Sequence, residues 1–202
     1  MAGSKLVYLL RHARIKNAGE QRRYIGQCDV PLDQEGIRQA ERLRERLLPA
    51  GIQSFFCSDL PRSQKTADIL AEGSGGRVFV RPELREIHLG EWEGLSFAEV
   101  IRRFPEKFEA RGRDIAYYRI RGGESFADCS QRVLPAYQKI VAETDGPVAI
   151  VGHAGVNRLI LCHLLGMPIA NLFRISQDFS CVNLIQYNGI NPQLKLINAV
   201  AL

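Results

Sequence analysis

Two histidines in this chain each follow a short apolar segment. His12 comes after residues 6–10 and Arg11, and His153 closes the segment 148–152. Segments of this length, rich in β-branched and large apolar side chains, are typical of buried strands in a parallel sheet. Ligands of such sheets bind at the edge formed by the carboxyl ends of the strands. The sequence therefore predicts that both imidazoles face one pocket, with the Arg11 guanidinium beside them.

These three side chains suit the chemistry of a phosphoryl group. A neutral imidazole can attack phosphorus, and a guanidinium group matches phosphate oxygens with parallel hydrogen bonds. The alternative interpretation is that each histidine only caps neighbouring backbone groups at a strand end. Two histidines in matching contexts favour the first interpretation, a site that handles phosphate.

Composition predicts a single domain over residues 1–202 that acts on a small anionic molecule. The chain has 46% hydrophobic and 24% charged residues and a formal net charge of +5, which suits an anionic substrate. A surface that is basic without function explains the charge about as well. The basic residues are dispersed, so we expect no nucleic-acid partner. No segment has the pattern of a signal peptide or a membrane span, so we expect a cytoplasmic protein without a membrane partner.

The cysteines predict neither a disulfide framework nor a zinc site. They are odd in number, scattered and without the spacing of two cysteines separated by two residues, which fits a reducing compartment. Histidines and carboxylates also lack the spacing of metal ligands, so we expect no metal and no cofactor. The sequence leaves monomer and homodimer both open.

Strand and helix patterns alternate along the chain, which predicts an α/β fold. Strands are predicted over residues 6–10, 55–57, 78–80, 148–151, 181–187 and 194–200. Helices are predicted from an N-cap at Asp33 to about Leu48, from Pro61 past Leu70, around 97–104, from a capping box at Ser125 onward, and over 156–165. We expect a three-layer sandwich with a mostly parallel central sheet and helices on both faces. Pro192 predicts that the last two strands are joined by more than a tight turn.

Residues 89 to 121 have a weaker pattern than the rest of the chain. Glycines, one short helix and several arginines predict a small insertion that covers the strand edge as a lid. These arginines either steer phosphate or are simply solvated, and the second interpretation is slightly favoured. They are Arg111, Arg113, Arg119 and Arg121.

Four motifs, in order along nearly the whole chain, carry a family resemblance. They are LLRH (9–12), SDLPR (58–62), LREIHLGEWEG (84–94) and GHAG (152–155). Together they resemble the histidine phosphatase superfamily, which is phosphoglycerate-mutase-like. The short chain, YIGQCDVPL (24–32) and GGES (122–125) are most similar to the branch of α-ribazole phosphatases and small broad-specificity phosphatases.

The resemblance implies a role for each matching residue. His12 matches the nucleophile that is phosphorylated, and His153 matches the second histidine of the pocket. Arg11 and Arg62 match the arginines that grip the phosphoryl oxygens, and Glu86 matches the proton donor. The resemblance thus implies a metal-independent phosphomonoesterase for a small metabolite, such as α-ribazole 5′-phosphate of cobalamin biosynthesis, acting through a phosphohistidine.

The first motif departs from the family pattern after the histidine. The family has Arg-His-Gly followed by Glu-Thr, whereas Ala13 and Arg14 stand here. Alanine is tolerated if its backbone keeps a negative φ, and Arg14 is expected to make the rim of the pocket more basic. Asn17 and Gly26 are expected to bind substrate, although Asn17 lies one position earlier than the family's pocket asparagine.

Other readings of the motifs stay open. Glu83, Glu91, Glu93 and His88 lie close enough in sequence to Glu86 to compete for the role of proton donor. A cofactor-dependent phosphoglycerate mutase is one alternative function, although that branch usually has a longer and more basic insertion. A non-catalytic module that binds phosphate or a phosphoprotein is another, suggested by the altered first motif.

Overall fold

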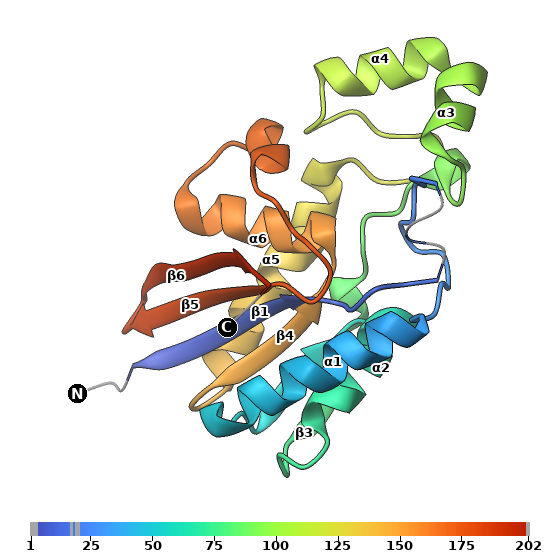
Figure 1. Cartoon of the computed structure of the whole chain (residues 1–202). Helices are drawn as coiled ribbons and strands as arrows, with labels where there is room; N and C mark the ends of the chain where they lie inside the picture. Colours follow the sequence, from blue (N-terminus) through green and yellow to red (C-terminus); the bar gives the residue numbers. More distant parts are fainter. Residues whose placement is uncertain (1–3, 17, 19–20, 201–202) are drawn as a thin grey trace.

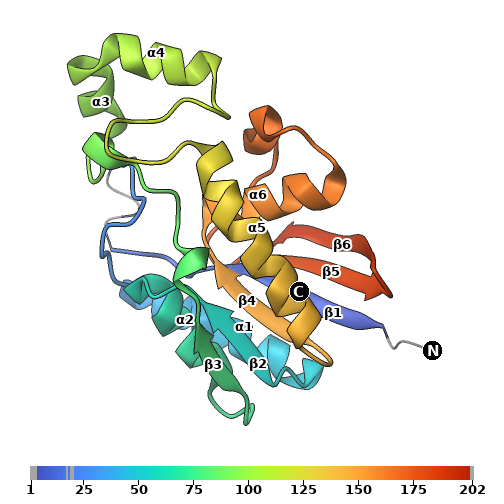
Figure 2. The same cartoon turned by 180° about the vertical axis from the view of Figure 1, so that it is seen from behind.

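The computed structural model describes residues 4–16, 18 and 21–200 and shows a six-stranded sheet between two layers of helices (Figures 1 and 2). The strands are β1 (Lys5–Arg11), β2 (Ser54–Cys57), β3 (Arg77–Val80), β4 (Val148–Gly152), β5 (Val182–Asn188) and β6 (Asn191–Ala199). The α-helices are α1 (Gln34–Leu47), α2 (Pro61–Ala71), α3 (Phe97–Arg103), α4 (Pro105–Arg113), α5 (Phe126–Glu143) and α6 (Ala154–Leu165). Short 3-10 turns cover Leu48–Ala50, Pro82–Leu84, Gly90–Trp92 and Ile169–Arg174.

The sheet order is β3-β2-β4-β1-β5-β6. The first four of these strands are parallel, while β5 runs antiparallel to β1 and β6 runs antiparallel to β5. Neighbouring residues of one strand point to opposite faces of a sheet, and this alternation sorts the core into two halves. Leu9 and Ile150 pack in the cluster that contains α5 and α6, whereas Leu10 and Val151 pack in the cluster that contains α1 and α2. The predicted three-layer sandwich with a mostly parallel sheet is confirmed.

The predicted helix starts at Asp33, Pro61 and Ser125 are also confirmed. The Asp33 side chain accepts a hydrogen bond from the backbone N–H of Gly36, and Ser125 forms a capping box with Asp128. Pro61 is the first residue of α2, where its missing N–H leaves no helical bond unmade. This start fixes Arg62 in the first turn of α2, next to the carboxyl end of β2.

The prediction of a long turn before the last strand is wrong. Only Gly189 and Ile190 join β5 to β6, and Tyr187 lies opposite Pro192 in the register. Gly189 has a φ of 65°, which the first central position of a type II′ turn requires. Proline is compatible with β6 because β6 is an edge strand, where an N–H can lack a ladder partner.

The segment 89–121 contains two helices where the pattern predicted one. Helix α3 ends at Arg103 and α4 begins at Pro105, with Phe104 between them outside the helical region, at φ −137° and ψ 51°. A proline disfavours helical backbone in the residue before it, so the two helices meet at an angle rather than merging. Both lie beyond the end of the sheet where β1 and β4 finish (Figure 1). No helix in the described part of the chain is long and apolar enough to cross a membrane.

Candidate active site

The two predicted histidines lie side by side at the carboxyl edge of the sheet. Arg11 at the end of β1 pairs with Gly152 at the end of β4, so the next residue of each strand enters the same space. The rings of His12 and His153 are 5.2 Å apart between centroids. Both residues are buried, with exposed fractions of 4% and 0%. The two imidazoles thus lie against each other at this edge of the sheet, as predicted, and of the two only His12 lines the hollow described below.

His12 is held as a neutral imidazole with a defined tautomer. Its Nδ1 lies 2.8 Å from the carbonyl oxygen of Ala13. Because a carbonyl oxygen only accepts, the proton of the neutral ring belongs on Nδ1 and the lone pair on Nε2. Burial, followed by the positive charges of Arg62 and Arg11, holds the pKa of His12 well below its usual range. The ring therefore presents a nucleophilic nitrogen at neutral pH.

His153 is fixed by a serine from the end of β2. The Ser58 hydroxyl lies 2.8 Å from Nε2 of His153 and also accepts the backbone N–H of Leu60. Since the hydroxyl proton has no other acceptor in the described part of the chain, we assign it to Nε2 of His153, which places the ring proton on Nδ1. Burial and then the charge of Arg62 hold the pKa of His153 well below its usual range. Nδ1–H is therefore a hydrogen-bond donor on a neutral ring.

Arg11 is held by a segment from the carboxyl-terminal half of the chain. Its Nη1 donates to the carbonyl oxygen of Gln177 at 2.6 Å, and its guanidinium carbon lies 3.9 Å from the ring centroid of Phe179. Burial lowers the pKa of Arg11 to about 10, so the side chain remains a cation at neutral pH. The same Phe179 ring packs against His12, with centroids 5.6 Å apart.

Arg62 is almost completely buried and is held by two backbone carbonyls. Its Nη2 donates to Gly26 at 2.5 Å, and its Nη1 donates to Cys28 at 2.7 Å. The backbone N–H of Gly26 in turn donates to Glu93, and a Cβ at residue 26 would lie 2.3 Å from a carboxylate oxygen of Glu93. Gly26, expected to bind substrate, thus supports the arginine, and its glycine identity permits this close approach.

Unused hydrogen-bond donors concentrate at this site. The described part of the chain has five buried side-chain nitrogen or oxygen atoms without a partner, and three of them are Nε of Arg11, Nε of Arg62 and Nδ1 of His153. Buried polar groups are normally paired, so three unpaired donors around one imidazole indicate that the site is built for an external acceptor. A phosphoryl group, with three oxygens, has the acceptors that these N–H groups need.

The side chain of Glu86, from the loop that follows Leu84, lies at the start of α6, the helix that directly follows His153. Its carboxylate accepts the backbone N–H groups of Gly155 at 3.0 Å, Val156 at 3.3 Å and Ile87 at 3.0 Å. A Cβ at residue 155 would lie 2.5 Å from Oε1 of Glu86, which explains the glycine at that position. The helix start thus fixes the carboxyl group next to the second histidine.

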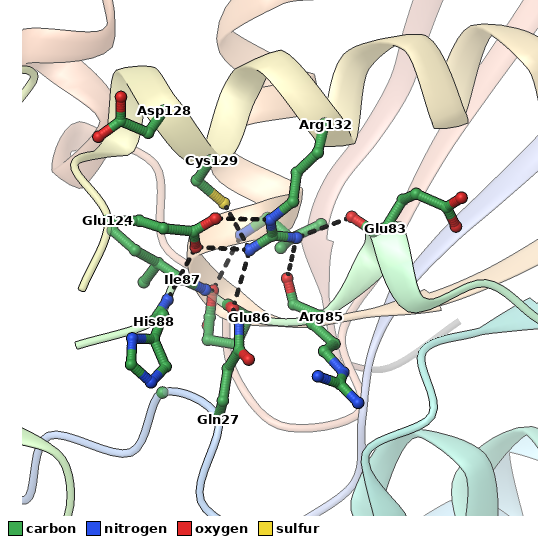
Figure 3. Close-up of polar contacts among 12 residues, drawn as sticks. Gln27, Glu83, Arg85, Glu86, Ile87, His88, Glu124, Asp128, Cys129 and Arg132 are labelled. Atoms are coloured by element: carbon green, nitrogen blue, oxygen red, sulfur yellow. Dashed lines mark hydrogen bonds and ion pairs between the residues drawn. The ribbon is translucent and has the colours of Figure 1, made fainter. Parts of the chain in front are cut away.

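The backbone that carries Glu86 is clamped by Arg132 of α5 (Figure 3). The guanidinium group donates to the carbonyl oxygens of Glu83, Arg85 and Glu86 at 2.7, 2.7 and 3.1 Å. It also forms a two-pronged ion pair with Glu124, at 2.8 and 2.7 Å. One side chain therefore holds three carbonyl groups within residues 83–86, and sequence reasoning did not assign it a role.

The competing proton donors are placed elsewhere. Glu93 accepts backbone N–H groups of residues 26, 27 and 89, and Glu91 pairs with Lys107. Glu83 is exposed, and the backbone of His88 is bonded to Glu124. None of these four side chains lines the hollow that contains His12, whereas Glu86 does.

That hollow has a volume of about 470 Å³ and a basic rim. Arg11, His12 and Glu86 line it together with Lys16, Arg22, Arg23 and Arg158, whereas Arg62 and His153 are buried and are not among its lining residues. The expectation for Arg14 is wrong, because its guanidinium pairs with Asp33 at 3.1 Å and does not line the hollow. Ala13 is buried and keeps a negative φ, so alanine fits there. Asn17 lies outside the described residues.

Metal ligands do not gather in the described part of the chain. No three histidine, cysteine, aspartate or glutamate side chains there are close enough to hold an ion. The cations at the site are instead guanidinium groups.

Three supporting residues were missed from the sequence. Ser58 lies inside a motif but has the composition of an ordinary turn residue. Gln177 and Phe179 lie in a loop just before β5, and nothing local in the sequence connects them to β1. Recognising that β5 is antiparallel to β1 would have found them, because the start of β5 then meets the end of β1.

A three-layer α/β fold with two buried imidazoles, two arginines and a carboxyl group at the sheet edge defines a site of the phosphoryl-handling class. A sequence profile of the histidine phosphatase superfamily (branch 1) matches residues 7–200. The chain belongs to this superfamily.

Relatives with two kinds of phosphatase name are similar to it. A glucosyl-3-phosphoglycerate phosphatase of Mycolicibacterium vanbaalenii is 36% identical over 172 residues, covering 81% of this chain and 75% of that protein. The adenosylcobalamin/α-ribazole phosphatase of Escherichia coli K12 is 28% identical over 201 residues, covering 97% of each. The crystal structure of the α-ribazole phosphatase from Shigella flexneri superposes with a TM-score of 0.89 at 28% identity, over 98% of both chains.

Proposed function

We propose that this protein is a phosphomonoesterase that transfers the phosphoryl group of a small phosphate ester to His12 and then to water. The observation that carries the proposal is the fixed tautomer of His12, which leaves the Nε2 lone pair free in a site where the buried Nε donors of Arg11 and Arg62 also lack a partner. An imidazole with its proton held on the far nitrogen is ready to form a bond to phosphorus without losing a proton first.

In the first step Nε2 of His12 attacks phosphorus and the bond from phosphorus to the ester oxygen breaks. Arg11, Arg62 and the Nδ1–H of His153 bind the phosphoryl oxygens, where charge accumulates. The positive charge that develops on the His12 ring is stabilised by the Ala13 carbonyl at its Nδ1–H. Glu86, as an acid, gives its proton to the leaving alkoxide.

In the second step water attacks the phosphohistidine. The ionised carboxylate of Glu86 takes a proton from the water, a new oxygen–phosphorus bond forms, and the electron pair of the phosphorus–nitrogen bond returns to Nε2 of His12. Inorganic phosphate leaves and both residues return to their starting states. The guanidinium groups supply the positive charge in each step, so no metal ion or other cofactor is required.

The substrate class proposed is a small, soluble phosphate ester. Relatives carry the names α-ribazole phosphatase and glucosyl-3-phosphoglycerate phosphatase, and both names describe monoesters of a metabolite alcohol. α-Ribazole 5′-phosphate, with a place in cobalamin biosynthesis, is therefore one candidate substrate. The basic rim of the hollow favours anionic metabolites of this kind over neutral ones.

Rapid quenching tests the proposal directly. Mixing the protein with p-nitrophenyl [³²P]phosphate in the presence of a chelator is expected to release phenolate and to trap label that is labile in acid and stable in base. His12→Ala is expected to abolish the trapped label, and His163→Ala, which changes an exposed histidine of α6, is the matched control. Label on a serine or cysteine, or activity that needs an added divalent ion, would contradict the mechanism.

A further inference from the structure

A second cavity adjoins the hollow that contains His12. It has a volume of about 600 Å³ and lies where α3 and α4 face the start of α6 and the 3-10 turn Ile169–Arg174. Arg22, Glu86 and Arg158 line both spaces, so the two adjoin at these side chains. Because Glu86 is proposed to protonate the leaving alcohol, the second cavity is where the alcohol half of a substrate extends.

Arg111 of α4 enters this cavity between aromatic rings. Its guanidinium carbon lies 5.7 Å from the ring centroid of Phe126 and 5.9 Å from those of Tyr24 and Trp92. Among the residues that the structure describes, its side chain makes no hydrogen bond and no ion pair, and burial lowers its pKa. The faces of the rings attract the cation but leave its N–H groups without acceptors. Arg111 is half-buried, so its N–H groups stay open to the cavity and can donate to an anion that binds there.

Arg158 of α6 contributes a second unneutralised cation to the same cavity. Its Nε donates to the carbonyl oxygen of Ile175 at 2.7 Å, and its guanidinium carbon lies 5.4 Å from the ring of Phe173. No carboxylate in the described part of the chain forms an ion pair with it. The one carboxyl group that lines the cavity, Glu86, already accepts three backbone N–H groups.

We propose that this cavity binds a second anionic group, carried by the alcohol half of the substrate, and that Arg111 and Arg158 bind that group. This inference rests on the function proposed above. A carboxylate or a second phosphate supplies oxygen pairs that match the donor fork of a guanidinium group. The aromatic walls exclude water, which strengthens such a pair relative to one on the surface. The substrates are then phosphate monoesters with an acidic group at a fixed distance from the ester phosphorus. Among the candidates named above, this favours esters of a phosphoglycerate type over α-ribazole 5′-phosphate, whose alcohol half carries no acidic group.

A ladder of synthetic esters tests this inference. Unbranched alkyl phosphates of increasing length are compared with esters of the same length that end in a carboxylate or in a second phosphate. For at least one chain length, the wild-type protein is expected to have a kcat/KM at least about tenfold higher for the anionic ester than for the neutral ester of the same length. Most of this difference is expected to be a lower KM for the anionic ester. The carboxylate and phosphate arms distinguish the two kinds of anion.

Two variants on the same helix complete the test. Arg111→Met is expected to remove the preference for the anionic ester, because it keeps the apolar stem and deletes the donors. Arg113→Met, which changes an exposed arginine paired only with Glu109, is expected to keep it. Equal kcat/KM for anionic and neutral esters at every length, or a preference that survives Arg111→Met, overturns the inference. Release of p-nitrophenolate by the wild type reports separately on the proposed function, which stands or falls on that assay.

Discussion

Glu86 is the single residue whose role can be separated by the choice of substrate. A proton donor matters most when the leaving alcohol is weakly acidic, because its alkoxide cannot depart unprotonated. Glu86→Gln is therefore expected to reduce kcat/KM for alkyl phosphates by about 100-fold or more, and to affect p-nitrophenyl phosphate much less. Steady-state rates on both substrates measure the difference.

The neighbouring carboxylates provide the controls for this prediction. Glu83→Gln and Glu91→Gln change side chains that do not line the hollow, so both are expected to leave the ratio of the two rates unaltered. An equal loss on both substrates in Glu86→Gln would mean that the carboxylate organises the start of α6 and does not donate a proton.

The residues with their own chemistry could be predicted from the sequence, and those that only support them could not. His12 and His153 were placed by the strand that precedes each of them. Ser58, Gln177 and Phe179 act through contacts that cross the fold, and such contacts depend on strand direction and loop path, which local patterns do not report. Arg14 shows the opposite error. Its charge predicts a role at the rim of the pocket, but in the folded protein its guanidinium group pairs with the carboxylate of Asp33.

At the scale of elements, helix α5 positions the loop that carries Glu86. Arg132 joins three carbonyl oxygens of that loop to Glu124, and lysine has too few donors to reproduce this geometry. Arg132→Met is therefore expected to displace Glu86 and to reduce the hydrolysis of alkyl phosphates at least about tenfold, with a smaller effect on p-nitrophenyl phosphate. The measurement is the ratio of the rates on alkyl phosphates and on p-nitrophenyl phosphate, compared between the variant and the wild type. The midpoint of thermal unfolding is recorded to confirm that the variant folds.

A surface arginine with the same type of pairing is the control for Arg132. Arg119 forms a two-pronged ion pair with Asp128, but its side chain is 64% exposed. Arg119→Met is expected to leave the ratio of the two rates unchanged. If Arg132 acts through Glu86, the double variant Arg132→Met with Glu86→Gln should lose little more than Glu86→Gln alone. Losses that multiply would assign Arg132 a separate role.

Element types could be predicted better than their junctions. The alternation of patterns correctly placed the parallel strands and the helices between them. The break at Phe104 and the two-residue turn at Gly189 were missed, because each depends on one residue and its neighbour rather than on a periodic pattern. For Arg111 the sequence only slightly favours solvation over a role with phosphate, for a related reason: the rings that surround it come from three separate parts of the chain.

At the scale of the whole molecule, the buried imidazoles couple stability to pH. His12 and His153 have a pKa well below the ordinary value of 6.5 in the folded protein, mainly because burial disfavours the charged ring. Below about pH 6.5 the unfolded chain therefore binds protons that the folded chain does not bind. The free energy of unfolding is expected to fall as the pH drops from about 6.5 to 5, by up to about 1.4 kcal/mol per pH unit for each histidine.

Denaturant titrations across this window measure the slope. The window lies above the ordinary pKa of carboxylic acids, so the carboxylates with a lowered pKa, such as Glu124 and Asp128, contribute only at lower pH. His12→Gln removes one of the two buried imidazoles and is expected to reduce the slope by about one proton. His163→Gln, at an exposed position, is expected to leave the slope as it is. A slope that His12→Gln does not change would mean that His12 binds protons in the folded protein as readily as in the unfolded chain, and that its burial does not keep the ring neutral below about pH 6.5.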